Sequence, residues 1–239
     1  ILVSDSEGQA SLFLGDIKKE LIENDDLRAL FGVKGFFKET ETDLIVDFDD
    51  GQSFRIIAKG SEQKLRGLKW GNKRPDLIIC DDMENDELVM NKERRDKFKK
   101  WFNSALLPCR SDKGLVRIVG TILHADSLLE QLMPKMWAKD TVEYGLKVYS
   151  RNRHSWHSLK YRAHSKDWDV LLWEAKKSKE DLQAIREMYK NQGLLDVYSQ
   201  EYLNNPIDES NTYFRRSDFL TMKEEDFDKP MVHYITMDL

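Results

Sequence analysis

Two periods of apolar residues are clear in the first sixty residues. Between residues 9 and 23 the apolar side chains recur every three or four positions, which predicts one amphipathic helix. Residues 43–58 alternate at every second position on either side of Asp50-Gly51. An Asp-Gly step between alternating runs is a strong hairpin signal. The pattern therefore predicts a helix followed by an antiparallel strand pair.

The run Leu77–Cys80 has a different pattern, because it is apolar throughout and leads directly into Asp81 and Asp82. An unbroken apolar run is typical of a strand buried on both faces. Open α/β sheets bind ligands at the carboxyl ends of their strands, and adjacent carboxylates suit Mg²⁺. In nucleotide hydrolases such a pair holds the metal and orients the attacking water. Taken alone, the pattern fits equally well two acids that end a strand and cap the next segment.

The later residues predict a similar mixture of helices and strands. We expect a strand at 115–119 that leads into Gly120-Thr121, and we expect helices at about 89–105, 125–138, 178–193 and 196–204. Ser178 and Asp181 suit a capping box. Together these elements predict an α/β fold, with a mainly parallel sheet flanked by helices.

The last thirty residues predict a linker and a new strand. Residues 206–230 are polar and carry no long period, whereas residues 231–238 are apolar and include Asp238. The chain begins at Ile1 inside one apolar run and ends at Leu239 inside another. We therefore expect an internal fragment of a longer protein.

Composition limits the partners. The chain has 239 residues, with 38 Lys and Arg against 43 Asp and Glu, so any nucleic-acid contact requires a local basic face. Residues 89–105 and 146–164 are candidate faces, although charged outer faces of ordinary elements explain them as well. Cys80 and Cys109 have no CxxC partner, so neither a zinc site nor a disulfide framework is expected. No apolar stretch reaches the roughly 18 residues of a membrane span.

An ordered set of motifs resembles the large terminase subunit of tailed bacteriophages, the motor that packages viral DNA. No single motif is specific, but the order and spacing match across nearly the whole chain. The set comprises Arg66-Gly67, the RPDLIICDD strand, Gly120-Thr121, QEYLNNP (200–206) and YITMD with Asp238.

The resemblance implies a domain organisation and a set of partners. Residues 1–150 would be a P-loop ATPase core of the additional-strand type, 151–215 a small lid, 216–230 a linker, and 231–239 the start of an RNase H-like nuclease. ATP and Mg²⁺ would be the cofactors. Double-stranded DNA, a portal protein, a small terminase subunit and a ring of identical subunits would be the partners. The protein would be phage-encoded and would work in the host cytoplasm, without a membrane.

The resemblance also implies roles in ATP hydrolysis. Asp81 would bind Mg²⁺, and Asp82 would align the attacking water at a position where the family more often has Glu. Glu84 would be a possible helper. Thr121, with Gly120, would sense the γ-phosphate and relay hydrolysis to DNA movement.

Two further roles concern the assembled ring and the nuclease. Arg66 would reach the nucleotide of a neighbouring subunit as an arginine finger, with Arg74 as the rival candidate. Asp238 would be the first metal-binding acid of the nuclease, whose partner acids would lie beyond Leu239.

The main departure from the family is the phosphate-binding loop. No GxxxxGK[ST] run occurs in the 239 residues, so we expect this chain alone to bind ATP poorly and hydrolyse little. Two other readings remain open. One is a non-catalytic binding or assembly module related to P-loop proteins. The other is a metal-dependent nuclease that uses Asp81, Asp82, Glu84 and Asp86.

Overall fold

The computed structural model of the chain describes residues 1–133, 147–151 and 156–206. All of them belong to one compact unit, Ile1–Ile207. The expected linker, the expected strand at 231–238 and its Asp238 lie outside the described residues. The domain boundaries expected at 150 and 215 stay predictions.

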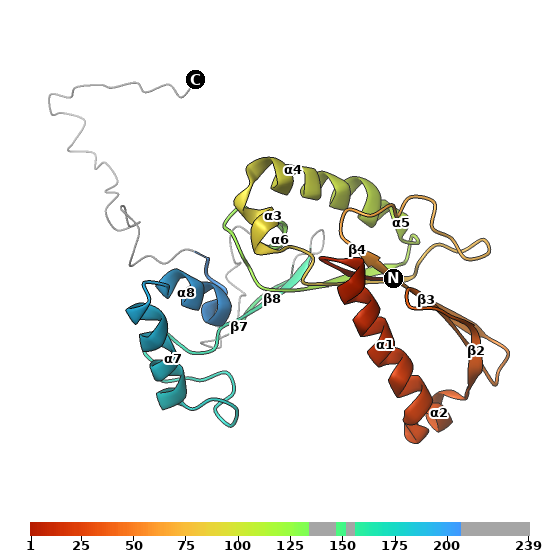
Figure 1. Cartoon of the computed structure of the whole chain (residues 1–239), viewed down its shortest axis with the longest axis horizontal. Helices are drawn as coiled ribbons and strands as arrows, with labels where there is room; N and C mark the ends of the chain where they lie inside the picture. Colours follow the sequence, from red (N-terminus) through yellow and green to blue (C-terminus); the bar gives the residue numbers. More distant parts are fainter. Residues whose placement is uncertain (134–146, 152–155, 207–239) are drawn as a thin grey trace, which may run out of the picture. The chain divides into compact units, whose positions relative to one another are not determined.

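A mixed, mostly parallel sheet of six strands forms the centre of the fold, in the order β2-β3-β4-β1-β5-β6 (Figure 1). β1 pairs in parallel with both β4 and β5, and β5 pairs in parallel with β6. β2 and β3 extend the sheet in antiparallel fashion. The strands are β1 Leu2–Ser4, β2 Val33–Glu39, β3 Asp43–Phe48, β4 Ser53–Gly60, β5 Leu77–Asp81 and β6 Leu115–Val119. The α/β expectation is confirmed at this level.

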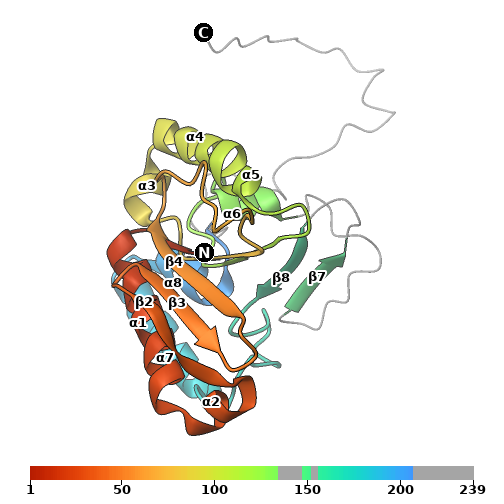
Figure 2. The same ribbon diagram turned by 90° about the vertical axis from the view of Figure 1, so that its right-hand side faces the viewer.

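Each face of the sheet has its own core. Ala10 and Leu14 of α1 (Glu7–Glu23) pack with Leu44 and Val46 of the hairpin on one face. Phe98 and other residues of the 86–109 helical segment pack on the opposite face, together with Ile78 and Cys80 (Figure 2). Ile78 and Cys80 of β5 are buried on this face, whereas on the other face Ile79 is half-buried and Leu77 is exposed. The burial on both faces that the unbroken apolar run predicts is therefore only partly confirmed.

Capping residues set the ends of the first two helices. Ser6 accepts a hydrogen bond from the Gln9 backbone N–H and begins α1. Asn24 accepts one from Leu27 and begins α2 (Asp25–Phe31), which ends at Gly32 with φ of 65°. Glycine suits this left-handed position because it has no Cβ to clash. The helix expected between residues 9 and 23 is confirmed as α1.

The helix expected at 89–105 is wrong in detail, because several helical pieces take its place. Asn91 has extended backbone angles and accepts a hydrogen bond from the Arg94 N–H, so it separates two helices. The pieces are α3 Asp86–Met90, α4 Lys92–Trp101, the π-helical turn η1 Phe102–Leu106 and α5 Leu107–Cys109. Asparagine is a favoured N-cap residue, and the prediction of one continuous helix overlooked this role of Asn91.

The strand β2 is absent from the sequence-based prediction. Its pairing with β3 shifts register between Val33 and Gly35 and again between Phe36 and Lys38. These irregularities remove the strict two-residue alternation that identifies a strand in sequence.

The remaining described elements follow β6. They are α6 Leu128–Leu132, the antiparallel pair β7 Lys147–Arg151 and β8 His157–Tyr161, α7 Lys179–Asn191 and α8 Leu195–Leu203. The capping box of Ser178 and Asp181 is confirmed. The described part of the expected helix at 125–138 is helical only over α6. No helix among the described residues is long and apolar enough to cross a membrane.

Candidate active site at the ends of β5 and β6

The acid pair and the Gly-Thr step meet at one edge of the sheet. β5 and β6 run in parallel with Asp81 opposite Val119. The Asp82 backbone N–H donates to the Val119 carbonyl at 3.1 Å. A Cβ added at Gly120 would lie 3.2 Å from Oδ1 of Asp82. Residue 120 is thus a position where a larger side chain would press directly on the Asp82 carboxylate.

Asp82 has an unusual backbone conformation. Its φ of 43° lies in the left-handed region, which few residues other than glycine adopt. Aspartate tolerates this region better than most residues. The turn ends β5 and directs Met83 into the core, where it is 4% exposed, while Asp82 itself remains exposed. Strained positions of this kind gather at functional sites.

The two carboxylates are electrostatically coupled. Burial raises the pKa of Asp81, and the charge of Asp82 raises it further. A cation between the two would relieve that repulsion. Mg²⁺ is commonly bound by one or two carboxylates together with water and substrate phosphates, so Asp81 and Asp82 fit it. Among the described residues, no three His, Cys, Asp or Glu side chains gather into a metal-binding group.

A small hollow lies between these strand ends and the start of α6. It is lined by Asp82, Met83, Glu84, Ile118, Val119, Gly120, Thr121, Leu128 and Leu129. Four of the predicted site residues therefore line this hollow: Asp82, Glu84, Gly120 and Thr121. Asp81 immediately precedes Asp82 in the sequence. Arg66 and Arg74 are not among its lining residues.

Glu84 has a clear structural partner. Its Oε1 accepts from the Leu128 N–H at 2.8 Å, and its Oε2 accepts from the Leu129 N–H at 3.1 Å. These are the first two backbone donors of α6, which have no partner inside the helix. Burial raises the pKa of Glu84, and the two N–H donors oppose that effect. Glu84 thus connects the segment after β5 to the helix after β6. Both carboxylate oxygens of Glu84 are used as hydrogen-bond acceptors in this connection.

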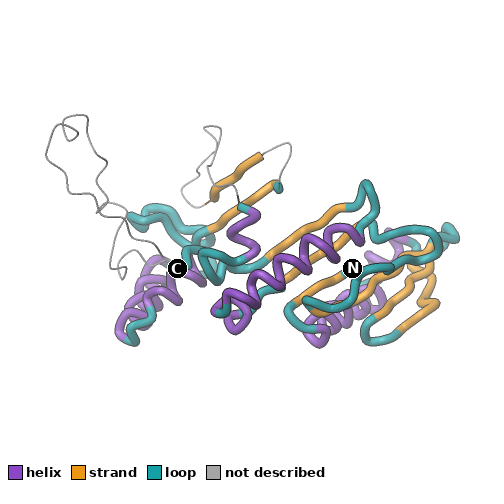
Figure 3. The backbone as a smooth tube through the Cα atoms, turned by 90° about the horizontal axis from the view of Figure 1, so that it is seen from above, coloured by secondary structure: helices purple, strands orange, loops and turns teal. Residues whose placement is uncertain are grey.

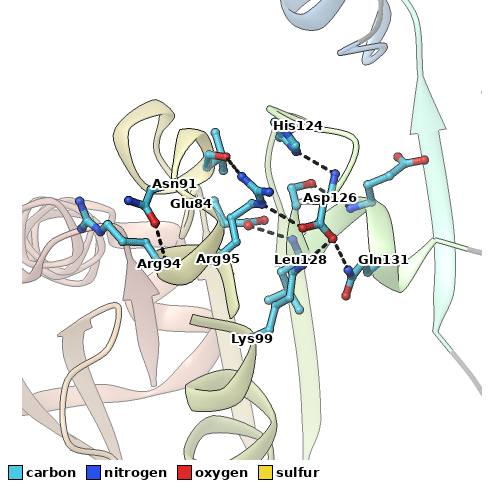
Figure 4. A network of polar contacts seen from close by, with 12 residues as sticks. Glu84, Asn91, Arg94, Arg95, Lys99, His124, Asp126, Leu128 and Gln131 are labelled. Atoms are coloured by element: carbon cyan, nitrogen blue, oxygen red, sulfur yellow. Dashed lines mark hydrogen bonds and ion pairs between the residues drawn. The ribbon is translucent and has the colours of Figure 1, made fainter. Parts of the chain in front are cut away.

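A second network holds the loop between β6 and α6 (Figure 4). The Asp126 carboxylate accepts from Arg95 Nε at 3.0 Å, Lys99 Nζ at 2.7 Å and Gln131 Nε2 at 2.6 Å. These donors hold the pKa of Asp126 at about 2. Since Arg95 is only 8% exposed, α4 presents a largely buried cation to this loop.

His124 belongs to the same loop. Its Nδ1 accepts a hydrogen bond from the Asp126 backbone N–H at 2.9 Å, which leaves the ring proton on Nε2. Burial and the nearby Arg95 lower the pKa of His124. The loop that follows Thr121 is therefore fixed both by its own turn and by α4.

Asn204 connects this loop to β8 and α8, a role that sequence reasoning missed. Its Oδ1 accepts from the Ile122 backbone N–H at 3.2 Å, and its Nδ2 donates to the Tyr161 carbonyl at 3.0 Å. Asn204 ends α8 with φ of 50°. An asparagine directly after a helical pattern is a known left-handed cap signal, but it does not predict a partner 82 residues away.

The arginines expected as fingers lie on the surface. Arg66 donates through Nε and Nη2 to the Ser104 carbonyl at 3.2 and 3.0 Å, and Arg74 donates to the Pro108 carbonyl. Both side chains are exposed. No described contact links either arginine to the acid pair.

No protein-family model, curated protein sequence or solved structure matches this chain.

Proposed function

We propose that the chain is the ATPase part of a DNA-packaging motor similar to the large terminase subunit of tailed bacteriophages. The observation that supports this most is the meeting of Asp81 and Asp82 with Gly120 and Thr121 at the ends of two parallel strands. In parallel α/β sheets this edge binds ligands. The ordered motifs of the sequence supply the family resemblance.

In this proposal Asp81 holds Mg²⁺ and Asp82 aligns water. The nucleotide would supply the phosphoryl group, and the metal would neutralise charge on its oxygens. The carboxylate of Asp82 is exposed and would accept a hydrogen bond from the attacking water. Thr121 offers a hydroxyl that both donates and accepts. Glu84 and Asp126 keep the two flanking loops in place rather than contacting the reacting groups.

The wider assignment follows the same resemblance. Double-stranded DNA, a portal protein and a small terminase subunit are the proposed partners, with a ring of identical subunits in the host cytoplasm. Asp238 is the proposed first metal ligand of a nuclease. The competing nuclease reading of Asp81, Asp82, Glu84 and Asp86 is weakened because both Glu84 oxygens accept helix N–H groups.

The test uses protein made from the complete reading frame, since the 239 residues contain no phosphate-binding loop. DNA-stimulated ATP hydrolysis is measured together with ATP binding. Asp82→Asn should stop turnover and leave binding within about twofold, because oxyanion and water-positioning contacts act mainly in the transition state. Asp96→Asn, which changes an exposed acid on α4 outside both candidate sites, is the matched control.

The possible results separate the readings. No ATP turnover by the wild-type protein, with or without DNA, would refute the motor. Turnover that survives Asp82→Asn would assign the catalytic carboxylate to another residue. DNA cleavage with Mg²⁺ or Mn²⁺ but without ATP, abolished by Asp81→Ala, would support the nuclease reading instead.

A further inference from the structure

The connection between β4 and β5 is unusual for parallel strands, because residues 61–76 cross the sheet without forming a helix (Figure 3). We call this segment the basic loop. It holds five basic residues and two acidic ones: Lys64, Arg66, Lys69, Lys73, Arg74, Glu62 and Asp76. The chain as a whole has a net charge of −5, so the positive charge of this loop is local.

Hydrogen bonds fasten the basic loop along the neighbouring helical segment. The side chain of Leu65 is fully buried in the core beneath α4 and anchors the loop from below. Successive residues of the loop contact successive residues of the segment that begins with α4, so the two run side by side in the same direction. They are Trp101 Nε1 to the Gln63 carbonyl at 2.9 Å, Arg66 to the Ser104 carbonyl, Arg74 to the Pro108 carbonyl, and the Ser111 N–H to the Pro75 carbonyl at 2.8 Å.

The tip of the loop is also ordered. Trp70 and Lys73 exchange two backbone hydrogen bonds, of 3.0 and 3.1 Å, around Gly71. Gly71 has φ of 57°, which glycine adopts without strain. Trp70 remains 42% exposed beside Lys73. Because the backbone of this tip is already ordered, binding a ligand would cost little conformational entropy for ordering the loop.

One acidic residue of the loop is ion-paired and the other accepts a hydrogen bond, whereas the lysines of the loop face solvent. Glu62 pairs with Lys97 at 3.1 Å, and Asp76 accepts from Ser111 Oγ at 2.8 Å. Lys64, Lys69 and Lys73 are exposed. Lys100 is exposed too, and it lies between Lys97 and Ser104 on the side of the helical segment that contacts the loop.

We propose that Lys64, Lys69, Lys73 and Lys100 form a binding surface for the phosphate backbone of double-stranded DNA. Lysine ammonium groups contact phosphates as point charges and carry no base information. Such contacts suit a motor that must move along any sequence. The assignment of duplex DNA as the partner rests on the proposed function, while the cationic surface itself follows from the geometry.

The experiment measures binding of a 30-bp duplex by fluorescence anisotropy, using protein from the complete reading frame at several salt concentrations. The triple change Lys64→Glu, Lys69→Glu and Lys73→Glu should weaken binding at least about tenfold and lower the slope of log K against log salt by about 3. The matched control reverses Lys19, Lys34 and Lys166, which are exposed on other elements. It should change both quantities much less.

Two measurements keep the result interpretable. The thermal midpoint of each triple variant should stay near that of the wild type, and if the loop variant is unstable, Lys64→Gln and Lys69→Gln replace the charge reversals. Basal ATP hydrolysis without DNA is recorded in parallel. Equal weakening by the loop and control variants would overturn the DNA surface even if ATP hydrolysis is normal, whereas absent hydrolysis with loop-dependent binding would refute only the motor.

A single strand of the same length serves as the comparison ligand. Tighter binding of that strand, weakened by Trp70→Ala, would overturn the duplex assignment in favour of base stacking on an aromatic side chain. Preference for the duplex, with no effect of Trp70→Ala, is the expected result.

Discussion

The Asp126 network gives a stability prediction that can be worked out from the structure. Asp126→Asn removes the negative charge that Arg95 Nε and Lys99 Nζ contact at 3.0 and 2.7 Å. Holding a carboxyl pKa at about 2 instead of 3.8 corresponds to at most about 2.5 kcal/mol. Because the Asp126 side chain is 39% exposed, solvent screening reduces this term to about 1 kcal/mol.

The buried partner gives a second estimate of the same cost. Arg95 is 8% exposed, and its guanidinium would lose its charged acceptor. Weakening a hydrogen bond to a buried charged group costs about 1–2 kcal/mol. The expected loss of unfolding free energy is therefore about 1–2 kcal/mol, equivalent to a thermal midpoint lower by about 2–8 °C for a chain of this size.

The pH dependence has a definite sign. The folded pKa of Asp126 is depressed, so its stabilisation is fully present above pH 3.8 and is lost as the pH falls toward 2. Urea unfolding followed by circular dichroism at pH 7, 5, 4 and 3 measures it. The difference between wild type and Asp126→Asn should be constant from pH 7 to 5 and should shrink below pH 4.

Asp96→Asn, which changes an exposed acid on α4, is the control and should leave the stability within about 0.5 kcal/mol. Combining Asp126→Asn with Lys99→Gln should give less than the sum of the two single effects, because both remove the same contact. An Asp126→Asn protein as stable as the wild type at pH 7, or a difference that persists unchanged at pH 3, would refute this account of the network.

Three further predictions concern the same region. Glu84→Ala should cost about 1–3 kcal/mol of unfolding free energy, since two α6 N–H groups lose their acceptor, and Glu84→Gln should cost less; a stable Glu84→Gln protein without ATP turnover would instead indicate a catalytic role. Gly120→Ala would place a Cβ 3.2 Å from Oδ1 of Asp82, so it should displace that carboxylate and lower turnover with little change in thermal midpoint. Asn204→Gly keeps the left-handed cap but removes the bridge to Ile122, so it should cost about 1–2 kcal/mol in urea unfolding; unchanged stability would mean that the bridge contributes nothing.

The proposed finger predicts an effect that depends on assembly. Arg66→Ala should lower ATP turnover only where subunits are assembled, because the exposed guanidinium contacts Ser104 rather than the acid pair of its own chain. Turnover is measured in dilute monomer and in assembled motor, and an equal loss in both would contradict action on a neighbour.

Local chemistry in the sequence determined much of this fold. The Asp50-Gly51 turn with its alternating flanks predicted the β3–β4 hairpin, and the capping box at Ser178 predicted the start of α7. The apolar run into Asp81 and Asp82 predicted an inner strand with its acids at the end, and β5 lies between β1 and β6, although only its Ile78 and Cys80 side chains are fully buried. Turn residues, caps and periodicity act over a few neighbouring positions, so a sequence alone can reveal them.

Tertiary structure decided which distant groups meet. The parallel pairing of β5 with β6 brings Gly120 to Asp82, and it allows Glu84 to reach α6 across 44 residues and Arg95 to reach Asp126 across 31. The sequence pattern did not predict β2, because its pairing with β3 is irregular. This segment is a strand because it forms backbone hydrogen bonds with β3. A carboxylate or amide in sequence shows what it can bind, whereas strand order and register decide which donors lie within its reach.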